Sequence, residues 1–226
     1  MNVLYNADYE YRSDLKLISQ NILVNGKLQR DVLSYSYDSK FELTSKKNVK
    51  SSIRDSRGQV KSFSDLEFGY HHLNLIKMST AEQTITNYYG ENNHFFGSCD
   101  NSKNCFFKLS PNEVELNGEL QKLIEVSGVP VGVLFKGNFY PAIIDHRMGV
   151  IGLLNTYGSD IKFLRHQDAW GNLDNVTGDR VFEKQITFGY ARLMQNPLVE
   201  QISKTKLYFS GTRVYSPAVG EWMSPD

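Results

Sequence analysis

Paired aromatic residues alternate with polar ones in the first half of the chain. Three such pairs each enclose a single residue: Tyr9 and Tyr11, Tyr35 and Tyr37, and Phe68 and Tyr70. Residues i and i+2 lie on the same face of an extended chain, so each pair puts two rings on one side of a strand. The pattern therefore predicts β-strands at these positions.

The same unit recurs along the chain. An apolar residue follows the second aromatic at the sixth position: Leu17 after Tyr11, Leu43 after Tyr37, Ile76 after Tyr70 and Phe95 after Tyr89. Four units with one internal offset indicate a degenerate supersecondary repeat. Turn signals lie between them at Asn25-Gly26, at 55–58 and at 97–104, which predicts β-hairpins.

These patterns predict an all-β fold of antiparallel hairpins with few short helices. Repeated units that cannot bury a face alone stack or coil into one continuous sheet. An independent antiparallel sandwich or barrel produces the same alternation and turns, so the spacing leaves both architectures open. No linker or shift in composition marks a domain boundary.

Two segments have spacing that is compatible with a helix. The first is 113–126, where Gly118 weakens an apolar pattern made by Leu116, Leu120, Leu123 and Ile124. The second is 191–203, which Pro197 interrupts.

Composition narrows the class of protein. The 226 residues carry 25 Lys and Arg against 25 Asp and Glu, which argues against a nucleic-acid binder or a polybasic membrane-surface module. The 13 Tyr, 13 Phe and 17 Gly beside only 6 Pro suit many short strands joined by turns. No apolar stretch is long enough to span a membrane, and the first residues do not resemble a signal peptide.

The sequence gives only weak signals for a metal site or for thiol chemistry. Cys99 and Cys105 could close a hairpin disulfide and match no zinc signature; the spacing favours unpaired thiols, and the compartment stays open. The five histidines are scattered, and His71 and His72 point to opposite faces if extended, so we expect no metal site and no cofactor. The basic interval 46–61 is interpreted as a solvated hairpin face.

Four elements of the C-terminal third resemble a known family. Residues Asp168–Leu173 are similar to the step "YDAFGNL", with Gln167 in place of Tyr, and Thr187–Ala191 is similar to "PFGFAG". Asp145–Gly149 resembles "DHLGS" with one residue inserted, and Arg213–Asp226 resembles the closing signature "RxYDPxxGRWxSxD". They occur in the order found in RHS/YD-repeat proteins. The resemblance is firm from about residue 140 and loose before it.

This resemblance implies a coiled β-strip that forms part of a hollow β-shell. Degenerate YD/RHS-type hairpin repeats would occupy 1–140 and the RHS-associated core region 141–226, as one continuous structural unit. The family includes bacterial Rhs polymorphic toxins and the shell component of insecticidal toxin complexes, whose shell encloses a C-terminal toxin. The implied partners are the rest of the shell and that toxin, with neither nucleic acid nor a membrane span. Export from bacteria is also implied, after synthesis in the cytoplasm.

The closing signature is where catalysis is expected in the family. Its two Asp residues and an Arg suit acid-catalysed peptide cleavage, in which one carboxylate acts as base and the other stays protonated. Here Asp226 and Arg213 match, but Ser216 replaces the first Asp, and a hydroxyl cannot serve as that base. We therefore expect a structural closing motif formed by Tyr215, Ser216, Pro217, Gly220 and Trp222, with the turn at Ser216-Pro217, its reversal at Gly220, and Trp222 packed inward.

The function that follows is a structural shell segment that encloses or presents a C-terminal toxin. One alternative is a self-processing, aspartate-dependent protease core that releases the toxin. A second is a surface adhesion or carbohydrate-binding module, which predicts several exposed coplanar aromatic rings, whereas the shell hypothesis places Tyr9, Tyr11, Tyr35, Tyr37 and Tyr70 in strand ladders.

Overall fold

The computed structural model describes residues 5–11, 17–24, 27–28, 33–37, 43–46, 52–63, 65–168, 170–203, 205–218 and 220–224, without the side chains of the ranges before 52 or of Asp174. The chain divides into two compact units, Met1–Val49 and Lys50–Asp226. The boundary predicted at residue 140 falls inside strand β16 (Asn138–Ile144) and stays a prediction about the repeat organisation.

The first unit is a small antiparallel sheet. Its strands run in the order β1-β2-β4-β5, and β3 pairs with β2. The bounds are β1 Tyr5–Tyr11, β2 Leu17–Val24, β3 Lys27–Leu28, β4 Leu33–Tyr37 and β5 Leu43–Lys46.

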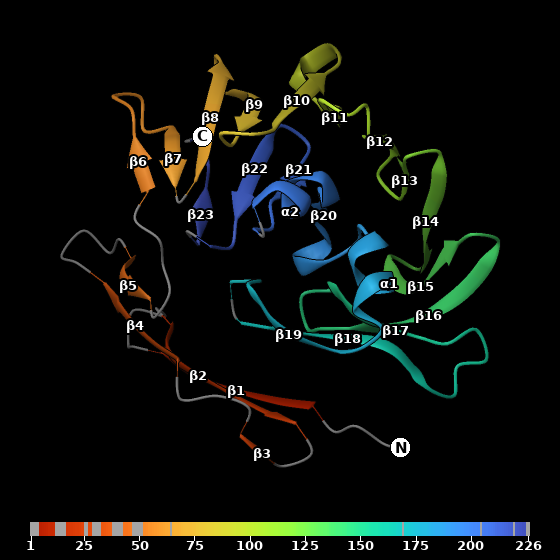
Figure 1. Cartoon of the computed structure of the whole chain (residues 1–226). Coiled ribbons are helices and arrows are strands. Elements are labelled where there is room, and N and C mark those ends of the chain that lie inside the picture. Colours follow the sequence, from red (N-terminus) through yellow and green to blue (C-terminus); the bar gives the residue numbers. More distant parts are fainter. Residues whose placement is uncertain are drawn as a thin grey trace. The chain divides into compact units, whose positions relative to one another are not determined.

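The second unit contains one continuous sheet of 14 strands, β6 to β19, in which every strand pairs with its neighbours in sequence (Figure 1). All of these pairs are antiparallel, so the predicted all-β fold of hairpins is confirmed. The remaining bounds are β6 Ser52–Arg54, β7 Val60–Phe63, β8 Leu66–His71, β9 Asn74–Ser79, β10 Thr84–Tyr89, β11 Phe95–Asp100, β12 Cys105–Ser110, β13 Glu113–Leu116, β14 Glu119–Val126, β15 Val129–Phe135, β17 Val150–Leu154, β18 Ile161–Gln167 and β19 Leu173–Gly178.

The predicted repeat corresponds to a recurring hairpin geometry. Three of the four aromatic residues pair across a hairpin with the apolar residue six positions on: Tyr11 with Leu17, Tyr37 with Leu43, and Tyr89 with Phe95. Tyr70 pairs instead with Leu75, one residue before Ile76. In all four hairpins the register shifts immediately before the aromatic residue. Such a bulge bends the strand and increases its twist, which suits a sheet that coils.

An acidic or amide side chain closes five turns of the large sheet in the same way. In each turn, Oδ1 accepts hydrogen bonds from the backbone N–H groups two and four residues later; the acceptors are Asp55, Asp100, Asp145, Asn155 and Asp168. The backbone oxygen of the same residue accepts from the N–H three residues on. The turn therefore satisfies its own backbone donors, as turn-forming Asp and Asn residues generally do.

The helix predicted at 113–126 is wrong. This segment is the hairpin β13–β14, with Asn117 (φ +51°) and Gly118 (φ +83°) in the left-handed conformation of a two-residue turn. In the other segment, Pro197 begins α2 (Pro197–Ser203) and does not interrupt a helix. Proline suits the first helical position, because the N–H group that it lacks would have no partner within the helix there. The sequence patterns missed α1 (Arg180–Gln185), which Asp179 caps by accepting a hydrogen bond from the Phe182 N–H.

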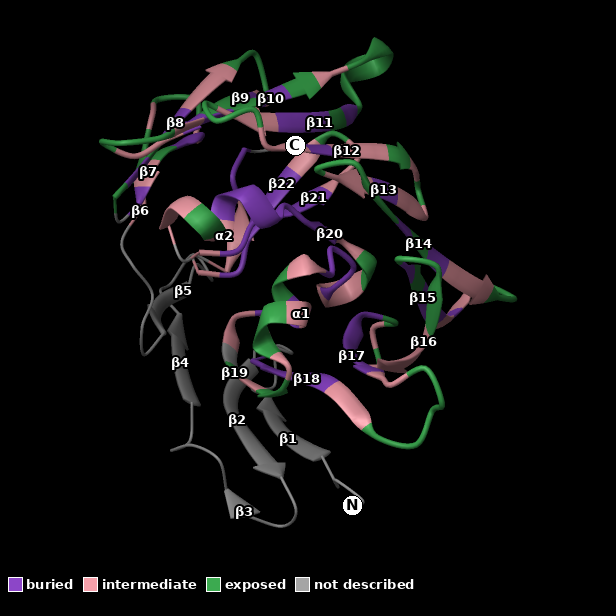
Figure 2. Cartoon of the chain, turned by 45° about the vertical axis from the view of Figure 1, so that its right-hand side comes forward, coloured by how far each residue is buried: buried purple, intermediate pink, exposed green. Residues whose placement is uncertain are grey.

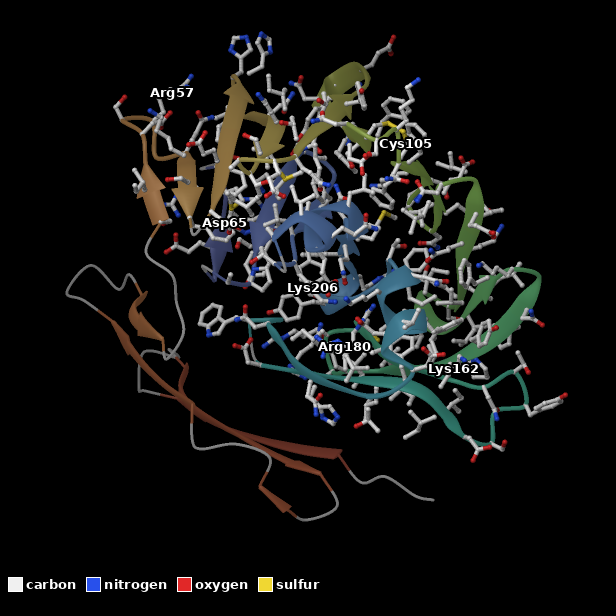
Figure 3. The ribbon with its side chains drawn as sticks, in the orientation of Figure 1. Arg57, Asp65, Cys105, Lys162, Arg180 and Lys206 are labelled. Carbon is white, nitrogen blue, oxygen red and sulfur yellow. A yellow bond between two sulfur atoms is a disulfide. The ribbon has the colours of Figure 1, made fainter. Side chains whose placement is uncertain are left out.

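The expectation of unpaired thiols is also wrong. Cys99 and Cys105 are register partners on β11 and β12, with Cα atoms 4.2 Å apart, and they form a disulfide. Figure 3 shows Cys105 on the side of β12 away from the C-terminal helices.

The C-terminal segment, residues 179–224, lies against the concave face of the large sheet (Figures 1 and 2). Besides α1 and α2 it contains the short sheet β20-β21-β22-β23, with bounds Met194–Gln195, Tyr208–Ser210, Arg213–Ser216 and Glu221–Trp222. The two layers share one apolar core, in which the rings of Phe95 and Phe209 lie 4.1 Å apart. The segment therefore provides the sheet with an inner hydrophobic layer.

A buried arginine connects the two layers. The side chain of Arg165, on β18, is fully buried, and its Nε donates to the carboxylate of Glu183 on α1 at 2.5 Å. Its remaining N–H groups reach the carbonyl oxygens of Phe188 at 2.7 Å and Ile186 at 2.8 Å. Lys206, labelled in Figure 3, donates to the same Glu183 oxygen at 3.0 Å. Burial alone would raise the pKa of Glu183, but the charges of Arg165 and Lys206 hold that pKa below its ordinary value.

The first prediction concerns the turn carboxylates. Replacing Asp145→Ala leaves the N–H groups of Arg147 and Gly149 without their acceptor, so we expect the free energy of unfolding to fall by about 1–3 kcal/mol. Asp145→Asn should retain most of the stability, since Asn155 makes the same turn in the natural chain. Urea unfolding of both variants measures this, and equal losses in the two would contradict the role given to Oδ1.

The second prediction concerns the buried ion cluster. Arg165→Met leaves Glu183 buried without its closest cation, and we expect a loss of about 3–5 kcal/mol in the free energy of unfolding at pH 7. The matched control is Lys162→Met on the same strand, because its ion pair with Asp179 (2.8 Å) is partly solvated and should contribute far less to stability. Similar losses in both variants would show that burial of the cluster is not what matters.

Candidate functional site

The closing motif predicted from the sequence folds as the hairpin β22–β23. The Gly220 N–H donates to the Ser216 carbonyl oxygen at 2.8 Å across the turn, and Gly220 has φ +77°. A side chain at this position would be strained, because φ is in the left-handed region. Ser216 and Glu221 are register partners at the base of the turn, and Pro217 follows directly.

Three residues of the motif stack on one face of this hairpin. The rings of Tyr215 and Trp222 meet edge to face at 5.5 Å, and the Arg213 guanidinium lies 4.2 Å from the centre of the Trp222 ring. Such cation–π contacts are favourable where the cation is partly desolvated. Trp222 is half-buried, whereas the next residue, Met223, is 1% exposed. The side chain that enters the apolar core at this end of the chain is therefore Met223.

Only part of the set proposed for self-cleavage lies within the described residues. Asp226 lies outside the described residues. Ser216 is fully buried at the position of the missing Asp, and its Oγ has no hydrogen-bond partner among the described residues. Glu221, the acid nearest in sequence, forms an ion pair with Arg54. Arg213 packs on the aromatic ring of Trp222.

The four sequence elements that resemble the family come together in space. Gly149, in the turn after β16, approaches the segment 187–191 so closely that a Cβ atom there would lie 2.8 Å from the Ala191 backbone nitrogen. Gly171, in the turn after β18, faces Tyr190, and a Cβ atom would lie 2.6 Å from its ring. Both glycines thus permit a close approach that any side chain would block.

Tyr190 is at the centre of this cluster. Its ring stacks on Tyr215 at 5.8 Å with an interplanar angle of 15°, and the Arg147 guanidinium lies 5.2 Å from its centre. The Tyr215 hydroxyl in turn donates to the Trp170 carbonyl oxygen at 2.9 Å. We call Arg147, Trp170, Tyr190 and Tyr215 the closing cluster. The sequence pattern identified the elements, but Tyr190 was not predicted as their meeting point.

The phenols of this region are unsuited to act as general bases. Burial raises the pKa of Tyr190 to about 12 and also raises the pKa values of Tyr208 and Tyr215. All three hydroxyls therefore remain protonated at neutral pH, where a general base must be able to accept a proton. Their hydrogen bonds and stacking support packing.

The closing hairpin is also tied to the start of the large sheet. The Val60 N–H, on β7, donates to the Met223 carbonyl oxygen at 2.9 Å. The Tyr70 hydroxyl, on β8, lies 2.9 Å from the Val60 carbonyl oxygen and 3.2 Å from that of Met223. Residues about 150 positions apart in sequence are thereby held together, so the hairpin connects the first and last parts of the second unit.

Other candidate sites from the sequence contribute little. The rings of His71 and His72 lie 4.4 Å apart, which corrects the expectation of opposite faces, because His72 is in a turn with φ +54°. Among the described residues, no group of three or more His, Cys, Asp or Glu side chains could hold a metal ion. In the basic interval, Lys46, Lys47 and Lys50 lie outside the described side chains, while Arg57 pairs with Asp55 at 3.3 Å. Within the described ranges, the helices are too short and polar to cross a membrane.

Comparison with known proteins identifies the fold. No family model and no curated protein sequence matches the chain. Solved structures do match: a TcdB2–TccC3–Cdc42 crystal structure (TM-score 0.63, 11% identity) and TcdB2–TccC3 without its hypervariable C-terminal region (TM-score 0.62, 12% identity). A Photorhabdus luminescens Tc holotoxin pore with a mutation in TccC3 matches at TM-score 0.59 and 10% identity.

Each of these alignments covers 98% of this chain and 12% of the matched chain. Identities this low establish the fold alone. The chain therefore has an RHS/Tc toxin-like fold and spans about 12% of the length of the toxin-complex chains that it matches.

Proposed function

We propose that this chain is a structural shell segment of an RHS-repeat toxin-delivery protein, which encloses or presents a C-terminal toxin. The observation that carries the proposal is the continuous sheet of 14 sequential strands that curves around its own C-terminal segment. A wall of this kind needs further strands to close, because β6 and β19, the end strands of the described sheet, each have one neighbour and so present an edge to pairing. The implied partners are the rest of the shell and a variable polypeptide that follows the closing hairpin.

The neighbours support this assignment at the level of fold. They are toxin complexes, and one is described without a hypervariable C-terminal region. By analogy, the wall segment described here would be the fixed part and the enclosed polypeptide the variable part. Export from bacteria as part of a toxin complex belongs to the same proposal.

The adhesion alternative receives less support from the exposed aromatic residues. Phe96 and Phe107 stack at 5.7 Å with an interplanar angle of 27°, and Phe96 is exposed. However, the Phe107 ring covers Gly97, where a Cβ atom would lie 2.4 Å from the ring. Rings that fill the space above strand glycines stabilise the sheet itself. Tyr70 is held by hydrogen bonds, and the side chains of Tyr9, Tyr11, Tyr35 and Tyr37 lie outside the described residues.

The third prediction tests enclosure. In the natural full-length polypeptide, together with any neighbouring chain that supplies further repeats, we expect the region after residue 226 to resist trypsin under native conditions. It should become cleavable once denaturant opens the wall. Gel analysis and mass spectrometry identify the fragments. Cleavage of that region at the rate of an unprotected peptide, or a gene that encodes nothing after residue 226 with no repeat-encoding neighbour, would overturn the proposal.

The fourth prediction tests self-processing. With the natural downstream sequence present, the unsubstituted chain should remain intact because Ser216 supplies no carboxylate. Ser216→Asp restores the family's acid, and a new fragment that ends near residue 226 should appear on a gel. The double substitution Ser216→Asp with Asp226→Asn is the matched control and should remain uncut. Cleavage of the unsubstituted chain would establish the protease alternative instead.

A further inference from the structure

A half-open groove separates the wall from the C-terminal segment. Its volume is about 280 Å³, near the lower end of the roughly 300–1,000 Å³ that is typical of ligand sites. The wall contributes residues of β13 to β15 and the hairpin turn between β13 and β14, and the other side comes from the end of α1 and from α2. A space of this size takes a short stretch of chain.

Hydrogen bonds within the chain hold the floor of the groove in place before any ligand binds. Gln121, on β14, is fully buried and donates from Nε2 to the Gln185 carbonyl oxygen at 2.5 Å. Its Oε1 lies 3.1 Å from the Thr187 backbone nitrogen and 3.3 Å from the Thr187 hydroxyl, and it accepts from both. Phe135, 2% exposed, packs beside it against Phe182. A preformed floor reduces the conformational cost of binding.

Most of the charged residues that line the groove already form ion pairs. Lys136 and Glu119 lie 3.8 Å apart, and Glu200 pairs with the buried Lys206 at 3.4 Å. Lys184 is the one lining cation that makes no ion pair among the described residues. The groove therefore has little charge with which to select a strongly acidic or basic ligand.

What the groove offers instead is amide side chains beside an apolar surface. Gln185 and Gln201 line it together with Leu116, Phe135 and Pro197. Asn117 also lines it, but its Oδ1 already accepts from the Cys105 N–H at 2.8 Å. An amide group both donates and accepts hydrogen bonds, so it can pair with the N–H and the C=O of a peptide unit. An extended chain turns alternate side chains to opposite sides, so that one set can lie on the apolar surface while its backbone meets the amides.

We propose that this groove binds an extended polypeptide segment through its backbone, with little dependence on sequence. This inference rests on the proposed function, because a fixed wall that encloses a variable polypeptide needs contacts that do not read side chains. The occupant is a short extended stretch of that enclosed polypeptide.

The fifth prediction tests the groove with the full 226-residue chain. An uncharged, unstructured 12-residue peptide of Gly, Ser, Thr and Ala is titrated, and NMR follows the side-chain amide signals of Gln185 and Gln201. Both signals should shift, and a peptide of scrambled sequence should bind within about threefold. Gln201→Leu should weaken binding about fivefold, the effect of one neutral hydrogen bond. Gln83→Leu, an exposed glutamine outside the groove, is the matched control and should bind normally.

Urea unfolding verifies that each variant remains folded. Absence of shifts at the groove amides, binding restricted to acidic peptides, or equal binding by Gln201→Leu and the unsubstituted chain would overturn the inference. Protease protection without groove binding would contradict only this inference. Groove binding without protection of any downstream region would contradict the shell proposal and leave a peptide-binding groove.

Discussion

The burial of Arg165 is the constraint on which the second unit depends. A fully buried guanidinium is costly unless every donor finds a partner. One of its acceptors, the Val150 carbonyl oxygen at 3.3 Å, lies on the neighbouring wall strand β17. The others are the carboxylate of Glu183 and the main-chain carbonyls at 183, 186 and 188, all in the C-terminal segment. Because most of these acceptors come from the inner layer, the guanidinium is fully hydrogen-bonded only when the two layers are correctly aligned. Apolar packing alone would tolerate a shift of one layer against the other, whereas the same shift would break the hydrogen bonds of Arg165.

The hairpins of the sheet depend on local geometry, in contrast to the long-range contacts of Arg165. Each hairpin of the repeat has a register shift before its last aromatic, and five turns are closed by an Asp or Asn oxygen that accepts two backbone N–H groups. Such a unit determines its own register without help from distant residues, because the turn satisfies its own donors. Many copies can therefore be joined in sequence order, and their bulges add twist at regular intervals. A curved strip follows from repetition of one local geometry.

The local hairpin geometry and the long-range contacts of Arg165 together explain what the sequence could and could not predict. The aromatic spacing found the hairpins because Tyr11 and Leu17, or Tyr89 and Phe95, are true cross-strand partners. The prediction of a helix at 113–126 failed because Leu116, Leu120 and Leu123 have helical spacing, yet Asn117-Gly118 forms a turn. The resemblance found the elements of the closing cluster, but neither Tyr190 as its centre nor the Arg165–Glu183 pair. Those contacts join residues far apart in sequence, and no local pattern records them. Residues 99 and 105 illustrate the same limit, since a disulfide depends on register that spacing alone leaves open.

The closing hairpin separates architecture from chemistry. Ser216 stands where the signature that this segment resembles has a carboxylate. The hairpin turns tightly at Gly220, Tyr215 stacks on Tyr190, and the Met223 carbonyl oxygen accepts a hydrogen bond from β7. Gly149 and Gly171 permit the close approaches that bring the other elements to Tyr190. These contacts have a structural role that needs no acid, because the hairpin joins β7 and β8 to the inner layer and so completes the core. The hairpin is thus complete with a fully buried serine, and no carboxylate, at position 216.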